Sequence, residues 1–147
     1  MSQYLSFELV YKENPEIKVD LGYWCTSIAR SISYNFDNVF NYTENDITLT
    51  VGDMESYIDS IHSGIDKYKK HLQKEIENKR ENTELLIRAQ TTVAMDAIRE
   101  DIANNDESIA AWEDEIETWT NVETELIFIL EVYKENIEGW DLIYRNA

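Results

Sequence analysis

The chain has 147 residues, of which 43% are hydrophobic and 12% aromatic, and its formal net charge at pH 7 is −17. These proportions are typical of a folded globular domain, so the charge does not indicate disorder. The acidity argues against direct binding to nucleic acids or anionic membranes, because both need clustered lysines and arginines. With a single cysteine, no secretory signal and no long apolar run, the chain is expected to be cytoplasmic.

Residues 1–53 predict a small antiparallel sheet with a short helix. Apolar and polar residues alternate from Leu5 to Tyr11 and again from Ile17 to Tyr23, which indicates two strands of a hairpin. A short amphipathic helix follows, and Ile47 to Val51 alternate as a third strand. The expected fold class is therefore α+β, beginning with a three-stranded ββαβ unit.

Residues 54–147 predict a long antiparallel helical hairpin that starts with Asp53 as its N-cap. Apolar residues recur at intervals of three and four, as in a coiled-coil seam. Asn104–Asp106 is the expected bend between the two helices. Folding the chain there would place Trp112 against Ala97 and Trp119 near Ala89, so that large side chains meet small ones.

Two features leave alternatives open for this helical part. The first helix can break near Asn82–Thr83, which would give a three-helix bundle instead of a hairpin. The five apolar residues Leu126–Leu130 cannot all face one partner helix, so they need a second neighbour. That neighbour is either the N-terminal sheet or a second copy of the chain, and Ile127 and Phe128 are the candidate residues of such an oligomer interface.

Acidic residues are concentrated toward the C-terminus. Residues 84–125 contain twelve acids but only two bases, Arg88 and Arg99. With a bend at residues 104–105, these carboxylates would crowd the tip of the hairpin, either as a solvated face or as a binding surface for a basic partner. The acids assigned to this partner-binding tip are Asp106, Glu107, Glu113, Asp114, Glu115, Glu117, Glu123 and Glu125.

Motifs for catalysis or cofactor binding are missing from the sequence: it has no phosphate-binding glycine loop, no nucleophile elbow and no zinc-binding pattern. We therefore expect no enzyme activity, no cofactor and no metal. A weaker hypothesis is a site for a small phosphorylated ligand at Arg30, Tyr34 and Tyr42, since arginine beside hydroxyl and aromatic groups can hold a phosphate.

These observations favour a non-enzymatic inhibitor whose acidic tip occupies a basic surface of a nucleic-acid-binding protein, in the manner of a nucleic-acid mimic. The alternatives are an adaptor that forms a homodimer through its hairpin, and the small-ligand binder. In size and acidity the chain resembles phage-encoded counter-defence proteins. That resemblance implies a location in the cytoplasm of a bacterial host.

Overall fold

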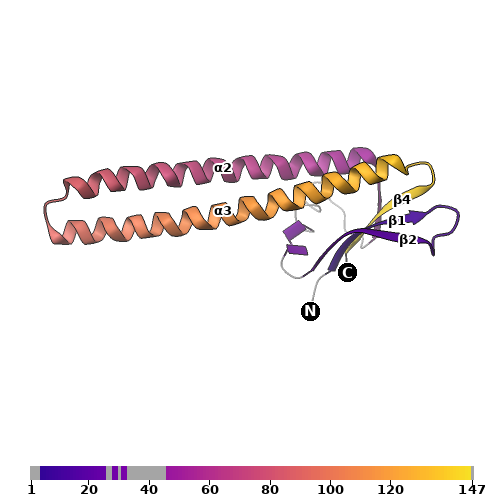
Figure 1. Ribbon diagram of the computed structural model, residues 1–147, viewed down its shortest axis with the longest axis horizontal. Helices are drawn as coiled ribbons and strands as arrows, with labels where there is room; N and C mark the ends of the chain where they lie inside the picture. The colour runs from indigo at the N-terminus through magenta and orange to yellow at the C-terminus, as the bar shows by residue number, and fades with distance from the viewer. Residues whose placement is uncertain (1–3, 26–27, 30, 33–45, 147) are drawn as a thin grey trace. The chain divides into compact units, whose positions relative to one another are not determined.

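The computed structural model describes residues 4–25, 28–29, 31–32 and 46–146, and its architecture is α+β (Figure 1). It divides into two compact units: unit 1 is formed by Met1–Ile61 with Val122–Ala147, and unit 2 by His62–Asn121. The elements in chain order are strands β1 (Tyr4–Tyr11), β2 (Lys18–Cys25) and β3 (Asp46–Leu49), helices α2 (Val51–Arg88) and α3 (Thr92–Glu135), and strand β4 (Trp140–Asn146).

The sheet of unit 1 has four antiparallel strands in the order β2-β1-β4-β3, so the expected three-stranded sheet is wrong by one strand. The additional strand, β4, pairs with β1 along its whole length. The helical hairpin expected over residues 54–147 is also wrong at its C-terminal end, because α3 ends at Glu135. The helix ends earlier because the carbonyl of Asn136 accepts hydrogen bonds from the backbone N–H groups of Gly139 and Trp140. Those bonds form a turn, and the chain then enters the sheet.

The core of unit 1 lies between the sheet and two helix segments, the N-terminal part of α2 up to Ile61 and the C-terminal part of α3 from Val122 (Figure 1). Phe7 on β1 is fully buried, and its ring lies 5.5 Å from that of Tyr144 on β4. On β2, a Cβ atom placed on Gly22 would lie 2.7 Å from Cδ1 of Ile129, so α3 packs closely onto the sheet there. The sheet is therefore a neighbour of the apolar segment on α3. Ile127 and Phe128 remain 40% and 55% exposed, and their role in an oligomer interface stays a prediction.

Helix α2 begins with a reciprocal pair of hydrogen bonds. The hydroxyl of Thr50 accepts from the backbone N–H of Asp53 at 3.0 Å, and the carboxylate of Asp53 accepts from the backbone N–H of Thr50 at 3.0 Å. Thr50 is therefore the N-cap in place of Asp53, in the manner of a capping box. Val51, expected to end the third strand, is the first residue of the helix.

In unit 2, α2 and α3 run antiparallel side by side (Figure 1). The bend lies at residues 89–91, because α2 ends at Arg88 and α3 begins at Thr92, so the bend expected at residues 104–105 is wrong. The hydroxyl of Thr91 caps α3 by accepting a hydrogen bond from the backbone N–H of Ala94 at 3.1 Å. Since α2 is continuous past Asn82–Thr83, the three-helix alternative is also wrong.

The position of the bend also overturns the expected pairing of tryptophans with alanines. Trp112 and Ala97 lie on the same helix, fifteen residues or about 22 Å apart along its axis. Trp112 stacks instead on His71 of α2, with ring centroids 4.8 Å apart. Trp119 is buried, and its indole Nε1 donates a hydrogen bond to the carboxylate of Glu115 at 3.2 Å.

Two glycines provide a test of this packing. Gly22→Ala should lower the free energy of unfolding by about 1–3 kcal/mol, because the added methyl group meets the buried side chain of Ile129. Gly64→Ala, within α2, places its methyl group in open space and should raise the free energy of unfolding by up to about 1 kcal/mol through helix propensity. Urea denaturation measures both changes, and equal effects of the two substitutions would contradict the close approach at Gly22.

Candidate functional site

The two helices of unit 2 meet along a coiled-coil seam. Residues spaced alternately by three and four are buried or half-buried on each helix, while most residues between them are exposed. On α2 the seam consists of Ile65, Tyr68, Leu72, Glu75, Lys79, Asn82 and Leu86. On α3 it consists of Met95, Ile98, Ile102, Asn105, Ile109, Trp112, Ile116 and Trp119.

A polar layer interrupts this seam near its middle. The side-chain amide of Asn82 donates to the side-chain oxygen of Asn105 at 2.8 Å, and the amide of Asn105 donates to the carboxylate of Glu75 at 3.2 Å. Beside them, Nζ of Lys79 lies 2.6 Å from the carboxylate of Asp106. Paired polar groups in a seam favour one register of the two helices, because any slip leaves them opposite apolar partners.

An aromatic cluster occupies the seam farther from the bend, toward residues 62 and 121 where unit 2 begins and ends. The Trp112 ring contacts Tyr68 at a centroid distance of 5.5 Å, in addition to its stack on His71. Burial, together with the negative charge of Glu115, raises the pKa of the Tyr68 hydroxyl above its usual value of 10.0. Aromatic pairs add about 0.5–1.5 kcal/mol beyond their buried area, so this cluster fixes the pairing of the helices here.

The charge of unit 2 is divided unequally between its helices. The α2 segment, residues 62–88, contains five acids and seven bases and has a net charge of +2. The α3 segment, residues 92–121, contains nine acids and one base and has a net charge of −8. The single base, Arg99, lies 3.4 Å from Asp96, so the remaining acids have no other base within this segment.

An outer acidic row, formed by Glu100, Glu107 and Asp114, follows one line along α3. The three residues are spaced by seven, are all exposed, and lie on the side of the helix opposite to the seam. Each step of seven residues advances about 10.5 Å along the helix. The exposed acids Glu113 and Glu117 flank this row. The row can therefore present carboxylates at regular intervals to a flat or grooved basic surface.

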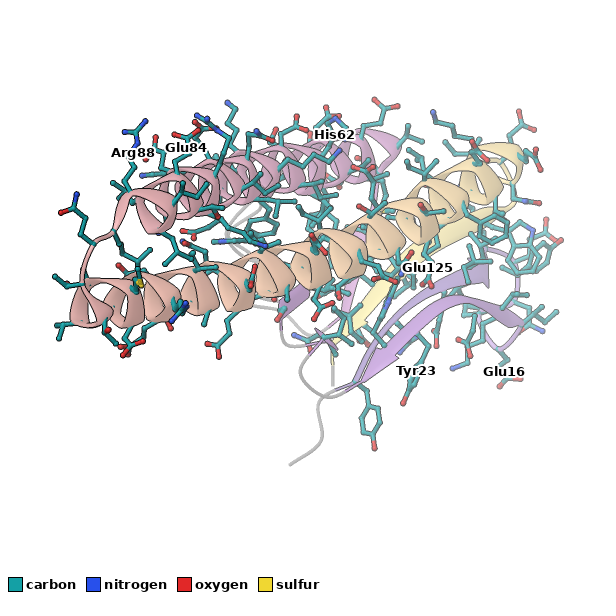
Figure 2. The ribbon with its side chains drawn as sticks, turned by 60° about the vertical axis from the view of Figure 1, so that its left-hand side comes forward. Glu16, Tyr23, His62, Glu84, Arg88 and Glu125 are labelled. Atoms are coloured by element: carbon teal, nitrogen blue, oxygen red, sulfur yellow. The ribbon has the colours of Figure 1, made fainter. Side chains whose placement is uncertain are left out.

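The eight acids assigned to the tip from sequence lie along the middle of α3 and are not gathered at one end of the hairpin. Asp106 is paired with Lys79, and Glu115 accepts the hydrogen bond from Trp119. Glu107, Glu113, Asp114 and Glu117 are exposed in unit 2. Glu123 and Glu125 belong to unit 1, where Glu125 is exposed (Figure 2). Sequence reasoning did not include Glu100, although its seven-residue spacing from Glu107 was a usable signal.

The bend itself carries apolar side chains where carboxylates were expected. Leu85 is 52% exposed, Ile87 80% and Val93 81%. We refer to these three residues as the apolar bend. Figure 2 shows the charged neighbours Glu84 and Arg88 on the side of α2 that faces away from α3.

The residues of the predicted small-ligand site, Arg30, Tyr34 and Tyr42, lie outside the described residues. Within residues 4–25, 28–29, 31–32 and 46–146, no group of three or more histidine, cysteine or acidic side chains is arranged to hold a metal ion. A hollow beside the seam of unit 2 is lined by four asparagines and two acids, namely Asn78, Glu81, Asn82, Asp101, Asn104 and Asn105.

No known family model, curated protein or solved structure matches this chain. In the part of the chain that the structure describes, neither long helix contains an apolar stretch that could cross a membrane.

The polar layer provides a prediction about stability. Asn105→Ala should lower the free energy of unfolding by about 1–2 kcal/mol, because Asn82 and Glu75 both lose their hydrogen-bonding partner in a part-buried position. The neighbouring Asn104→Ala removes an exposed amide and should change it by less than about 0.5 kcal/mol. Chemical denaturation measures these changes. Adding the single variant Asn82→Ala and the double variant Asn82→Ala with Asn105→Ala completes a cycle in which the shared hydrogen bond appears as non-additivity.

The Tyr68 hydroxyl provides a prediction about pH. Because its pKa is raised in the folded state, the stability it contributes is complete below pH 10 and is lost as the pH rises through the folded-state pKa. Glu115→Gln should lower the pKa of Tyr68 part of the way, since burial, the larger cause, remains. Ultraviolet titration of tyrosinate, with Tyr68→Phe to assign the signal, measures the shift. An unchanged pKa in Glu115→Gln would contradict the proximity of the two side chains.

Proposed function

We propose that this protein is a non-enzymatic binding protein that presents the outer acidic row of α3 to a basic surface on a partner protein. The single observation behind the proposal is the exposed row itself, on a helix segment with a net charge of −8. Carboxylates that their own helix does not neutralise attract a cationic partner and speed its encounter.

The most suitable partner is a protein whose basic surface normally binds nucleic acid, because such surfaces contain clustered lysines and arginines. The charge density of α3 bears on how closely it can imitate a nucleic acid. A net −8 over thirty residues is about one charge per 5–6 Å of helix, compared with one per 3.4 Å along a DNA strand. The proposal is therefore charge complementarity to a basic protein groove, with a weaker field than that of the nucleic acid it would displace.

A charge-reversal experiment tests the location of the binding surface. In the variant Glu100→Lys, Glu107→Lys, Asp114→Lys, Glu117→Lys, capture of the partner from host extract should weaken by about tenfold or more, equivalent to about 1.4 kcal/mol. Binding of the wild type should also weaken steeply as salt is raised.

The matched control reverses four exposed acids of unit 1: Glu16→Lys, Glu131→Lys, Glu135→Lys and Glu138→Lys. Both variants carry the same net charge, so a difference between them reports the position of the acids alone. Quantitative mass spectrometry of the captured proteins provides the comparison. Equal recovery of the same partner by the wild type and the α3 variant, at all salt concentrations, would show the proposal to be wrong.

A further inference from the structure

The exposure of the apolar bend is not explained by the packing of the coiled coil. Ile87 and Val93 are about four-fifths exposed, although both are large aliphatic residues. The adjacent seam positions, Leu86 and Met95, are half-buried and already close the end of the seam. Three exposed aliphatic side chains lie within nine residues of the chain around one bend, and apolar exposure concentrated in this way marks interaction surfaces more often than scattered exposure does.

The bend is also free of net charge, in contrast to the rest of α3. Residues 84–99 contain two acids, Glu84 and Asp96, and two bases, Arg88 and Arg99. Glu84 lies 2.9 Å from Arg80, and Asp96 lies 3.4 Å from Arg99. The buried centres of protein interfaces are depleted of charged residues, while their rims are polar. The neutral apolar bend has the composition of such a centre, and the adjacent acidic row has the composition of such a rim.

One residue of the apolar bend, Val93, lies in line with the acidic row. Val93 precedes Glu100 by seven residues, so Val93, Glu100, Glu107 and Asp114 share one line on the side of α3 away from the seam. A surface that contacts the row would meet Val93 about 10.5 Å before it meets Glu100. One continuous partner surface can therefore engage both Val93 and the row, while Ile87 lies next to the same bend at the end of α2.

From this arrangement we propose that the apolar bend is an anchor that enters an apolar pocket in the partner protein, with basic residues of the partner beginning about 10 Å from that pocket. The inference rests on the proposed function and adds the shape and chemistry of the partner's site. Ile87 and Val93 are the anchor residues, because they are the most exposed of the three. Few anchor side chains carry most of the energy in such interfaces.

Two other occupants fit less well. A second copy docked bend to bend would bury only the few side chains of each apolar bend, far less than the roughly 1,200–2,000 Å² of a stable interface. A lipid surface is disfavoured because the acidic row beside the bend is repelled by anionic headgroups. A concave protein pocket can enclose a convex bend on several sides, and basic flanks attract the row.

The test compares two full-length double variants with the same chemical change. Ile87→Ser with Val93→Ser should weaken partner capture by at least about 30-fold, the equivalent of the roughly 2 kcal/mol of one hot-spot side chain. Ile17→Ser with Val19→Ser, each wild-type side chain being 48% exposed in unit 1, should leave capture within about threefold of wild type. Denaturation curves must show that both variants are folded. If the double variant is unfolded, partner capture is measured with the single variant Val93→Thr, which keeps the shape of valine.

A photo-crosslinking residue in place of Ile87 identifies the occupant. Crosslinks to apolar residues of the partner, with lysines or arginines nearby in its sequence or structure, would support the inference. Full capture by Ile87→Ser with Val93→Ser, while the α3 charge reversal abolishes capture, would overturn the anchor and leave the proposed function standing. If neither variant loses capture of the partner, both the anchor and the proposed function are wrong.

Two further measurements separate the other occupants. The first is sedimentation velocity. A dimer of the wild type that is lost in Ile87→Ser with Val93→Ser would assign the bend to self-association and overturn the inference. The second is flotation of the protein with phosphatidylcholine vesicles. If the wild type floats and the variant Ile87→Ser with Val93→Ser does not, the bend binds a lipid surface and the inference is wrong. A monomer that does not float is the expected result.

Discussion

The hydrogen-bonded polar layer between α2 and α3 is the constraint on which the surface of unit 2 depends. Asn82, Asn105 and Glu75 are linked in the seam, and Lys79 is paired with Asp106 beside them. Paired polar groups within a seam favour one alignment of the two helices, because a slip leaves them opposite apolar partners. The aromatic stack of Trp112 on His71 reinforces the same alignment. Once the register is set, the direction of every other side chain on the two helices follows from the helical period.

The surface that results is strongly asymmetric. Because the seam takes the residues spaced by three and four, the outward line of α3 is left with one valine followed by three acids. Seven of the eight bases of unit 2 lie on α2, and the structure shows one of them, Lys79, bridging to an acid of α3. Neutralisation inside the unit is therefore incomplete, and exposed pairs of this kind contribute only about 0–1 kcal/mol each. The asymmetric charge and the apolar end of unit 2 are the features that support the proposed protein partner.

Unit 1 depends on a different long-range interaction. Its central strand β1 comes from the N-terminus, and the adjacent strand β4 comes from the C-terminus, so the sheet is complete only when the last seven strand residues have paired. On the outer side of this sheet, Arg145 of β4 donates to Glu8 of β1 at 2.5 Å and to Asp46 of β3 at 3.2 Å, which links three strands. The whole of unit 2 lies in sequence between the two parts of unit 1. Closing such a long connection costs conformational entropy, which the burial of Phe7, Leu142 and Tyr144 must offset.

Sequence alone determined the local features: the alternation that makes β1 and β2 strands, the three-and-four spacing that makes α2 and α3 helices with a seam, and the net acidity of α3. Tertiary structure decided the bend and the last strand. Asn104–Asp106 has the composition of a helix cap, and only the positions of Asn82, Glu75 and Lys79, more than twenty residues away, turn Asn105 and Asp106 into interhelical partners. Trp140, Leu142 and Tyr144 continue an apolar pattern that suits a helix or a strand, and the open edge of β1 selects the strand. In both cases the local signal is compatible with two structures, and a partner distant in sequence chooses between them because it alone can satisfy the exposed polar groups or backbone hydrogen bonds.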